Sequence, residues 1–200
     1  MDRRKSMRIL PEDSCGIVID YQEKLLPAIA ENKELLFRTT ELLEGLAVLG
    51  VPLLVTTQYE KGLGATVPEI EKAAGRAEHF DKISFSAYGD EAVRTALSGL
   101  GTEPGRPRKN VIICGIEADI CVLQTVLDLR EAGCCPVLVE DCVSSRQLHD
   151  KKIAVMRAYQ EGAVVTTCES LLFELAGRAG TPQFKQISAL IKAKEKSRLC

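Results

Sequence analysis

Three side chains in this sequence are suited to nucleophilic catalysis: the thiol of Cys121, the carboxylate of Asp20 and the ammonium group of Lys82. A thiolate is a strong nucleophile, but it needs a group that accepts its proton and a charge that balances its own. Asp20 and Lys82 can supply these functions. A histidine is the more common partner, but the two histidines, His79 and His149, have no evident route to Cys121.

Cys121 is placed near the start of a helix predicted over residues 118–131. The backbone N–H groups and the dipole of a helix N-terminus favour a thiolate. At 100° per residue, Cys121 shares a face with Gln124, Thr125 and Asp128, whereas the apolar side chains lie on the other face. An unreactive core cysteine is expected on the apolar face, so we interpret Cys121 as a nucleophile.

The elements that must position these groups alternate between strands and helices. Short apolar, β-branched runs predict buried parallel strands at residues 15–20, 51–57, 110–114, 136–140 and 163–167, with a weaker strand at 78–83. Helical patterns cover residues 32–49, 90–97, 118–131, 148–160 and 170–175. This order predicts a three-layer α/β/α sandwich around a parallel sheet. A further helix at 183–198 is the expected arm for contacting another subunit.

Ligands of such a sheet bind beyond the carboxyl ends of its strands, where the strand order reverses. Gln22, Gln58 and Tyr59 follow the first two predicted strands, and Phe85 and Tyr88 follow the weaker one. We expect these five side chains to bind the substrate. The long segment 58–90 has weak periodicity and several glycines, which is typical of a segment that covers a site.

The composition describes one globular domain over residues 1–200, with a core at about 13–178 and the C-terminal helix at about 183–198. The chain is 46% hydrophobic and 27% charged, with a net charge of −2. This balance offers no basic surface for nucleic acid or for a membrane. No apolar run approaches the roughly 20 residues that span a bilayer, and no signal peptide is evident. We expect a soluble, cytoplasmic protein whose ligand is a small molecule.

The eight cysteines predict neither a disulfide framework nor a metal site. No two of them have Cys-x-x-Cys spacing, and the histidines are far from any close cysteine pair. Structural zinc sites need clustered ligand pairs. The glycine patterns of nucleotide-binding loops are also missing. We therefore expect free thiols, no metal and no cofactor.

Four segments resemble the isochorismatase-like cysteine hydrolases. They are IVIDYQ at residues 17–22, FDKISFS at 80–86, GIEADICVLQTVLDL at 115–129 and DCVSS at 141–145. The segments occur in the family's order and span nearly the whole chain. Residues 56–64, TTQYEKGLG, and 115–118, GIEA, most resemble the subgroup called isochorismatase domain-containing proteins.

The resemblance implies a catalytic triad of Asp20, Lys82 and Cys121, with Cys121 attacking a carbonyl carbon to form a covalent intermediate. Asp20 would accept the thiol proton and later activate water, and Lys82 would stabilise charge. The resemblance also implies a cis peptide bond between Ile116 and Glu117, with the N–H groups of Glu117 and Cys121 forming an oxyanion hole. The implied fold has a six-stranded parallel sheet, and the implied assembly is a homo-oligomer, a dimer or larger.

Two differences between this sequence and other members of the superfamily limit the reactions that we predict. Nicotinamidases of this superfamily bind a metal through Asp and His residues after the second strand, and residues 56–64 contain neither type. Isochorismatases that cleave a vinyl ether can work without the cysteine, so Cys121 favours hydrolysis of an amide or related C–N bond. The prediction is a metal-independent cysteine hydrolase of a small amide-like substrate. A vinyl-ether hydrolase and a catalytically idle oligomeric scaffold remain as alternatives.

Overall fold

The structure of the protein is a computed structural model that describes residues 8–100 and 108–198. The strands are β1 (Ser14–Ile19), β2 (Leu53–Gln58), β3 (Glu78–Lys82), β4 (Asn110–Gly115), β5 (Cys135–Val143) and β6 (Val164–Thr166). The α-helices are α1 (Asn32–Val48), α2 (Glu60–Leu63), α3 (Pro68–Ala74), α4 (Glu91–Gly99), α5 (Leu123–Glu131), α6 (Leu148–Gln160), α7 (Cys168–Ala176) and α8 (Pro182–Arg198). Short helices η1 (Pro11–Asp13), η2 (Leu26–Ala28) and η3 (Ala118–Val122) complete the described elements; η3 is a π-helical turn.

The six strands form one parallel sheet in the order β3-β2-β1-β4-β5-β6. The chain builds outward from β1 to β3 and then returns to the other side of β1 with β4. The strand order therefore reverses between β1 and β4, and this is where an open parallel sheet offers its ligand site.

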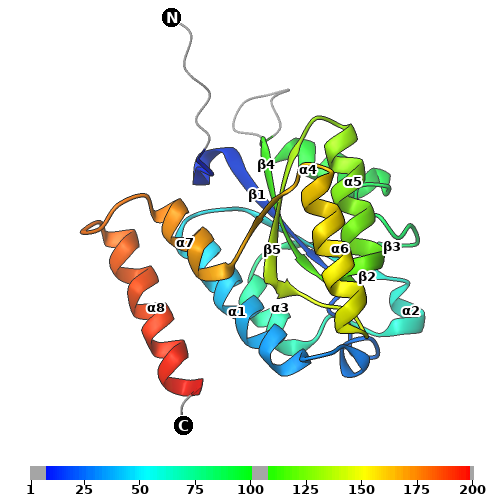
Figure 1. Ribbon diagram of the computed structural model, residues 1–200, viewed down its shortest axis with the longest axis horizontal. Coiled ribbons are helices and arrows are strands. Elements are labelled where there is room, and N and C mark those ends of the chain that lie inside the picture. The colour runs from blue at the N-terminus through cyan, green and yellow to red at the C-terminus, as the bar shows by residue number, and fades with distance from the viewer. Residues whose placement is uncertain (1–7, 101–107, 199–200) are drawn as a thin grey trace, which may run out of the picture.

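Helices cover both faces of the sheet, as Figure 1 shows. Successive side chains of a strand point to opposite faces. Val18 accordingly belongs to the core with α1, α3, α7 and α8, whereas Ile17 and Ile19 belong to the core with α4, α5 and α6. The predicted three-layer α/β/α sandwich is confirmed.

The structure differs from the predicted elements mainly between residues 58 and 90. This segment contains the short helices α2 and α3 before β3. Helices of four and seven residues complete too few turns for a clear apolar period, which explains why the sequence pattern did not predict them. The strand predicted at 136–140 is longer in the structure, where β5 continues to Val143. Its pairing with β4 is irregular near this end.

The C-terminal helix α8 packs against its own chain. Ile187 and Ile191 are buried in the same core as α1 and α7, and the ring of Phe184 lies 5.9 Å from that of Phe173. In Figure 1, α8 lies beside α7 at one side of the molecule. The apolar side chains of α8 are therefore used within the chain, and a contact of this helix with another subunit stays a prediction. Among the described residues, no helix combines the length and the apolar character needed to cross a membrane.

Candidate active site

Asp20 lies directly after β1, beside the point where the strand order reverses. Its side chain is fully buried, and its backbone has a left-handed conformation with φ of 58°. This region is uncommon for a residue other than glycine. The hydroxyl of Thr56 in β2 donates a hydrogen bond of 2.8 Å to Oδ1 of Asp20, and the Asp20 N–H donates to the Thr56 carbonyl at 3.1 Å. Sequence reasoning did not single out Thr56.

Lys82 is the last residue of β3, and its side chain is fully buried. Its Nζ donates at 2.7 Å to Oδ2 of Asp20 and at 2.7 Å to Oε1 of Gln58. The carbonyls of Ser84 and Phe85 also accept from Nζ, at 3.2 and 3.1 Å. A buried ammonium group is tolerated when it is paired and hydrogen-bonded, and these acceptors come from the residue after β1, from β2 and from the segment after β3.

Cys121 lies in η3, directly before α5, and its side chain is 6% exposed. The pKa of its thiol is raised to about 12, first by burial and then by the negative charge of Asp20, while the positive charge of Lys82 lowers it. The net shift of this pKa is upward, although the start of a helix favours a thiolate. Burial and the nearby carboxylate outweigh the helix terminus, so the group at rest is a thiol.

Thr125 connects the turn that contains Cys121 to the segment that follows β3. It lies one turn after Cys121, on the face predicted from the sequence, and is fully buried. Its hydroxyl donates to the carbonyl of Cys121 at 2.7 Å and accepts from the N–H of Ala87 at 2.8 Å. Thr125 therefore holds η3 against the segment whose carbonyls receive Lys82.

The peptide bond between Ile116 and Glu117 is cis. The chain is held on both sides of this bond. The N–H of Ile116 donates to the carbonyl of Ile19 at 3.0 Å, and the N–H of Ala118 donates to the carbonyl of Ser144 at 2.8 Å. Glu117 thus enters η3 from a backbone fixed to β1 and to the end of β5.

Two of the five expected substrate-binding residues use their side chains within the protein. Oε1 of Gln22 accepts from the N–H of Gln58 at 2.8 Å, and its Nε2 donates to the carbonyls of Gln58 and Gly64 at 3.1 and 2.7 Å. Gln58 in turn binds Lys82 and donates to the carbonyl of Ile83 at 2.7 Å. Both glutamines hold the segments around Lys82 in place.

The aromatic candidates lie closer to solvent. Tyr59 and Phe85 are 50% and 54% exposed, and Ile83, next to Lys82, is 71% exposed. We call Tyr59, Ile83 and Phe85 the apolar rim. Tyr88 is half-buried and packs against the core of α4, α5 and α6. It is therefore less exposed than the side chains of the apolar rim.

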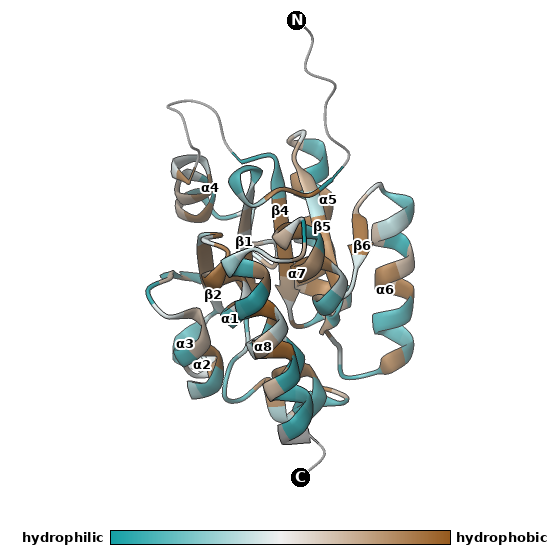
Figure 2. Ribbon diagram, turned by 90° about the vertical axis from the view of Figure 1, so that its left-hand side faces the viewer, coloured by the Kyte–Doolittle hydropathy of each residue, from teal (hydrophilic) through white to brown (hydrophobic). Residues whose placement is uncertain are grey.

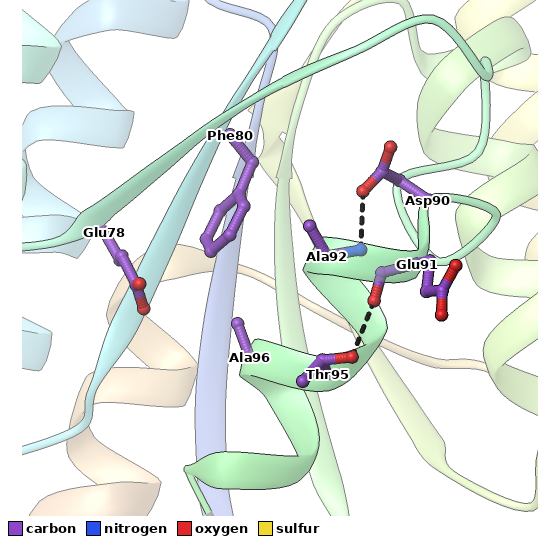
Figure 3. A pocket seen from close by; sticks show the side chains of 7 residues that line it. All are labelled: Glu78, Phe80, Asp90, Glu91, Ala92, Thr95 and Ala96. Atoms are coloured by element: carbon purple, nitrogen blue, oxygen red, sulfur yellow. Dashed lines mark hydrogen bonds between the residues drawn. The ribbon is translucent and has the colours of Figure 1, made fainter.

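A separate cavity of about 560 Å³ lies between β3 and α4. Figure 3 shows its lining, with Phe80 projecting from β3 towards the first turns of α4. Asp90 caps that helix by accepting from the N–H groups of Ala92 and Val93 at 2.9 and 3.2 Å. None of Asp20, Lys82 and Cys121 lines this cavity.

Potential metal ligands do not gather in the part of the chain that the structure describes. There, no three His, Cys, Asp or Glu side chains come together as a set that could hold a metal ion. The buried charges near the switch point are instead paired with each other, through Asp20 and Lys82. This arrangement can move a proton between a thiol and a carboxylate beside an ammonium group.

Comparisons with known proteins identify the family of this chain. The family model described as "Isochorismatase domain" matches residues 14–170. The secreted isochorismatase effector Isc1 of Phytophthora sojae is 39% identical over 188 residues, covering 92% of this chain and 87% of its own. Isochorismatase domain-containing protein 2A of Mus musculus is 38% identical over 185 residues, covering 92% of this chain and 85% of its own.

A solved structure, the MAR1 ribonuclease of Caenorhabditis elegans, superimposes with a TM-score of 0.84. It is 37% identical, and the match covers 92% of both chains. The range matched by the family model includes Asp20, Lys82 and Cys121. The chain belongs to the isochorismatase family and is a hydrolase.

Proposed function

We propose that this hydrolase cleaves a small amide-like C–N bond through a thioester on Cys121, with Asp20 as the proton carrier and Lys82 as its charge partner. The observation that carries the proposal is the proximity of three buried groups from distant parts of the chain. Nζ of Lys82 lies 2.7 Å from Oδ2 of Asp20, and the negative charge of the same carboxylate is close enough to Cys121 to raise the pKa of its thiol. All three side chains are buried at the switch point of the sheet.

In the first step the sulfur of Cys121 attacks the carbonyl carbon. Because the resting thiol is protonated, its proton passes to the Asp20 carboxylate as the S–C bond forms. The electron pair of the C=O bond moves onto oxygen. The backbone N–H groups of Glu117 and Cys121 are the proposed donors that stabilise this oxyanion. Lys82 offsets the charge of Asp20 before the proton arrives.

In the second step the oxyanion collapses and the C–N bond breaks. Asp20 returns the proton to the leaving nitrogen, which departs as an amine or ammonia, and the acyl group remains on Cys121 as a thioester. Asp20 then takes a proton from water as that water attacks the thioester. Breakdown of the second intermediate releases a carboxylic acid and restores the thiol of Cys121 with the proton from Asp20.

The apolar rim supports a substrate whose acyl part is small and apolar. Tyr59, Ile83 and Phe85 expose apolar surface next to Lys82, and ligand sites combine such surface with a few polar groups. The worm relative is named a ribonuclease. An RNA substrate needs basic groups for its phosphates, and the net charge of −2 favours the small molecule.

We propose a cytoplasmic location and assembly as a homo-oligomer. All seven cysteines of the described residues are free, which fits a reducing compartment. The Phytophthora relative is named a secreted effector. Fractionation of the source cells tests the location: the proposal expects the protein in the cytosol, and recovery only from the medium contradicts it.

The test of the reaction is acid-quenched mass spectrometry of the enzyme mixed with a panel of small aliphatic and aromatic primary amides. We expect an added acyl mass on the Cys121 peptide and release of ammonia. Both should vanish in Cys121→Ala but persist in Cys135→Ala, a matched change at a half-exposed cysteine. Amide turnover by Cys121→Ala at the wild-type rate would overturn the proposal. The same variants are also assayed with isochorismate and with RNA. Activity on only one of these two substrates would likewise overturn the proposal.

A further inference from the structure

A second ion pair lies beside the turn that contains the proposed nucleophile. It joins Glu117, the residue directly before η3, to Arg146, which follows β5: Nε of Arg146 donates to Oε2 of Glu117 at 2.8 Å. The backbone N–H of Arg146 donates to the same oxygen at 3.3 Å. The side chain of Glu117 is 12% exposed, whereas that of Arg146 is 62% exposed. A largely buried carboxylate thus receives its counter-charge from a side chain at the surface.

The ends of two neighbouring strands bring this ion pair together. β4 and β5 pair in parallel, and Figure 2 shows both largely in the brown of apolar residues. The segments that follow them stay side by side, because the N–H of Ala118 donates to the carbonyl of Ser144 at 2.8 Å. The hydroxyl of Ser145 also donates to a carboxylate oxygen of Asp119. These contacts hold both segments, so the ion pair is placed by the fold.

The carboxylate of Glu117 has the wrong sign for the reaction that we propose. The N–H of Glu117 is one of the two proposed oxyanion donors, and it forms no hydrogen bond with any of the described residues. Burial and the charge of Asp20 are the larger causes that raise the pKa of Cys121, and the charge of Glu117 raises it further. A negative charge at this residue opposes both the thiolate and the oxyanion. The donor therefore works best when that charge is neutralised.

Arg146 is the cation that neutralises Glu117. The other charged groups that act on Cys121 or on Arg146 come from several elements and are Asp20, Lys82, Asp119 and Asp150. Lys82 is the one cation among them, and it is bound to Asp20. An ion pair that is exposed at both ends contributes little. Here the carboxylate is largely buried, so the loss of its partner acts on the site.

We propose that Arg146 is a positioning residue for the reaction of Cys121, which neutralises Glu117 so that the N–H of Glu117 can stabilise the oxyanion. This role rests on the proposed hydrolysis through Cys121 and adds to it a residue outside the triad. Arg146 acts through Glu117 and holds one oxygen of that carboxylate with both its guanidinium group and its backbone N–H.

The test compares two reactions of Cys121 in the full chain. With p-nitrophenyl acetate the sulfur bonds to the acetyl carbon, the thiol proton passes to Asp20, and an oxyanion forms before the ester C–O bond breaks and p-nitrophenolate leaves. Iodoacetamide alkylates the same sulfur by displacing iodide, without an oxyanion. In Arg146→Met we expect alkylation at pH 8 to slow by up to about threefold, because the pKa of Cys121 rises. Acylation should slow by about tenfold, because the oxyanion is opposed as well.

Two further substitutions separate the charge from the contact. Arg146→Lys keeps the positive charge and should stay within about threefold of the wild type in both reactions. Glu117→Gln removes the negative charge and keeps the backbone N–H, so adding Arg146→Met to it should have little further effect. A purely structural role predicts a double variant as slow as Arg146→Met, since the Nε contact is lost in both. Arg178→Met, at an exposed arginine between α7 and α8, is the control and should leave both rates unchanged.

Acylation of Arg146→Met at the wild-type rate overturns the role of Arg146, and so does a double variant as slow as Arg146→Met. Thermal unfolding of each variant confirms that it is folded. Release of p-nitrophenolate by Cys121→Ala at the wild-type rate has a different meaning, because it refutes the proposed hydrolysis and the role of Arg146 with it. Failure of the role alone leaves acylation at Cys121 of the wild type intact, so the two failures are distinguishable.

Discussion

Replacing Asp20 by asparagine is expected to make Cys121 more reactive towards an alkylating agent while it abolishes hydrolysis. Burial is the main reason that the pKa of Cys121 is raised to about 12, and the negative charge of Asp20 adds to the effect. Asparagine removes the charge and leaves Lys82, which lowers the pKa of Cys121, in place. The thiolate fraction at a given pH therefore rises, although the proton carrier is lost.

The size of the effect follows from the proximity of the two groups. Two unit charges about 4 Å apart at an effective dielectric constant of about 20 interact by about 4 kcal/mol, a factor on the order of 1,000 in an equilibrium constant. Asparagine leaves the burial of Cys121 unchanged. We expect a rise in the alkylation rate at pH 8 on the order of a hundredfold, since only the thiolate reacts.

Lys82→Met should have the opposite sign. It removes the one charge that lowers the pKa of Cys121, so alkylation at pH 8 should slow. The assay is iodoacetamide labelling from pH 6 to pH 10, followed by peptide mass spectrometry, with the half-exposed Cys135 of the same sample as the reference. If Asp20→Asn slows the labelling of Cys121 as Lys82→Met does, the account of a thiol held protonated by its carboxylate is refuted.

Three stability predictions concern the same region. Lys82→Met should lower the free energy of unfolding in urea by about 3–5 kcal/mol, because Asp20 is left as an unpaired buried charge; adding Asp20→Asn should recover part of this loss. Thr125→Val should cost about 1–3 kcal/mol, because a buried N–H group loses its acceptor. Gly115→Ala should yield little folded protein, because φ is 154° and a Cβ there would lie 2.5 Å from Cβ of Ile19.

Controls accompany each of these variants. Strictly additive losses in the Asp20→Asn/Lys82→Met pair would contradict the coupling of the two charges. Thr125→Ser keeps the hydroxyl and should stay closer to the wild type than Thr125→Val. Gly99→Ala adds a Cβ where no atom lies within 4 Å and should leave the circular dichroism and the melting temperature unchanged. A well-folded Gly115→Ala protein would contradict the crowding at Ile19.

The sheet could be predicted from the sequence because its strands are short apolar runs rich in β-branched residues. The run at residues 15–20 is typical, and the structure has β1 at Ser14–Ile19 with Asp20 directly after it. The positions of Lys82 and Cys121 could be predicted in the same way. Lys82 is the last residue of β3, and Cys121 lies in the turn after β4. The local pattern was sufficient here because buried parallel strands are apolar on both faces.

The environment of the site depends on tertiary contacts that no local pattern encodes. The left-handed backbone of Asp20 and the π-helical turn around Cys121 are set by segments far away in the chain. The raised pKa of Cys121 comes first from burial. Thr56 was missed because a threonine inside a strand is ordinary, and only the register of β1 with β2 brings it to the carboxylate.

The pair of Asp20 and Lys82 joins two strands that are not neighbours, because β2 lies between β1 and β3. The register pairs Gln58 with Lys82, and Gln58 and Thr56 of β2 each bind one member of the pair. A slip of β3 by one residue would turn Lys82 to the other face of the sheet and leave two buried charges without partners. Such misaligned sheets are thereby penalised. Asp20 and Lys82, the residues proposed for the chemistry, thus also favour the correct register of the edge strand β3. A variant that neutralises both charges is expected to lose its activity and to form sheets with a shifted β3 more often.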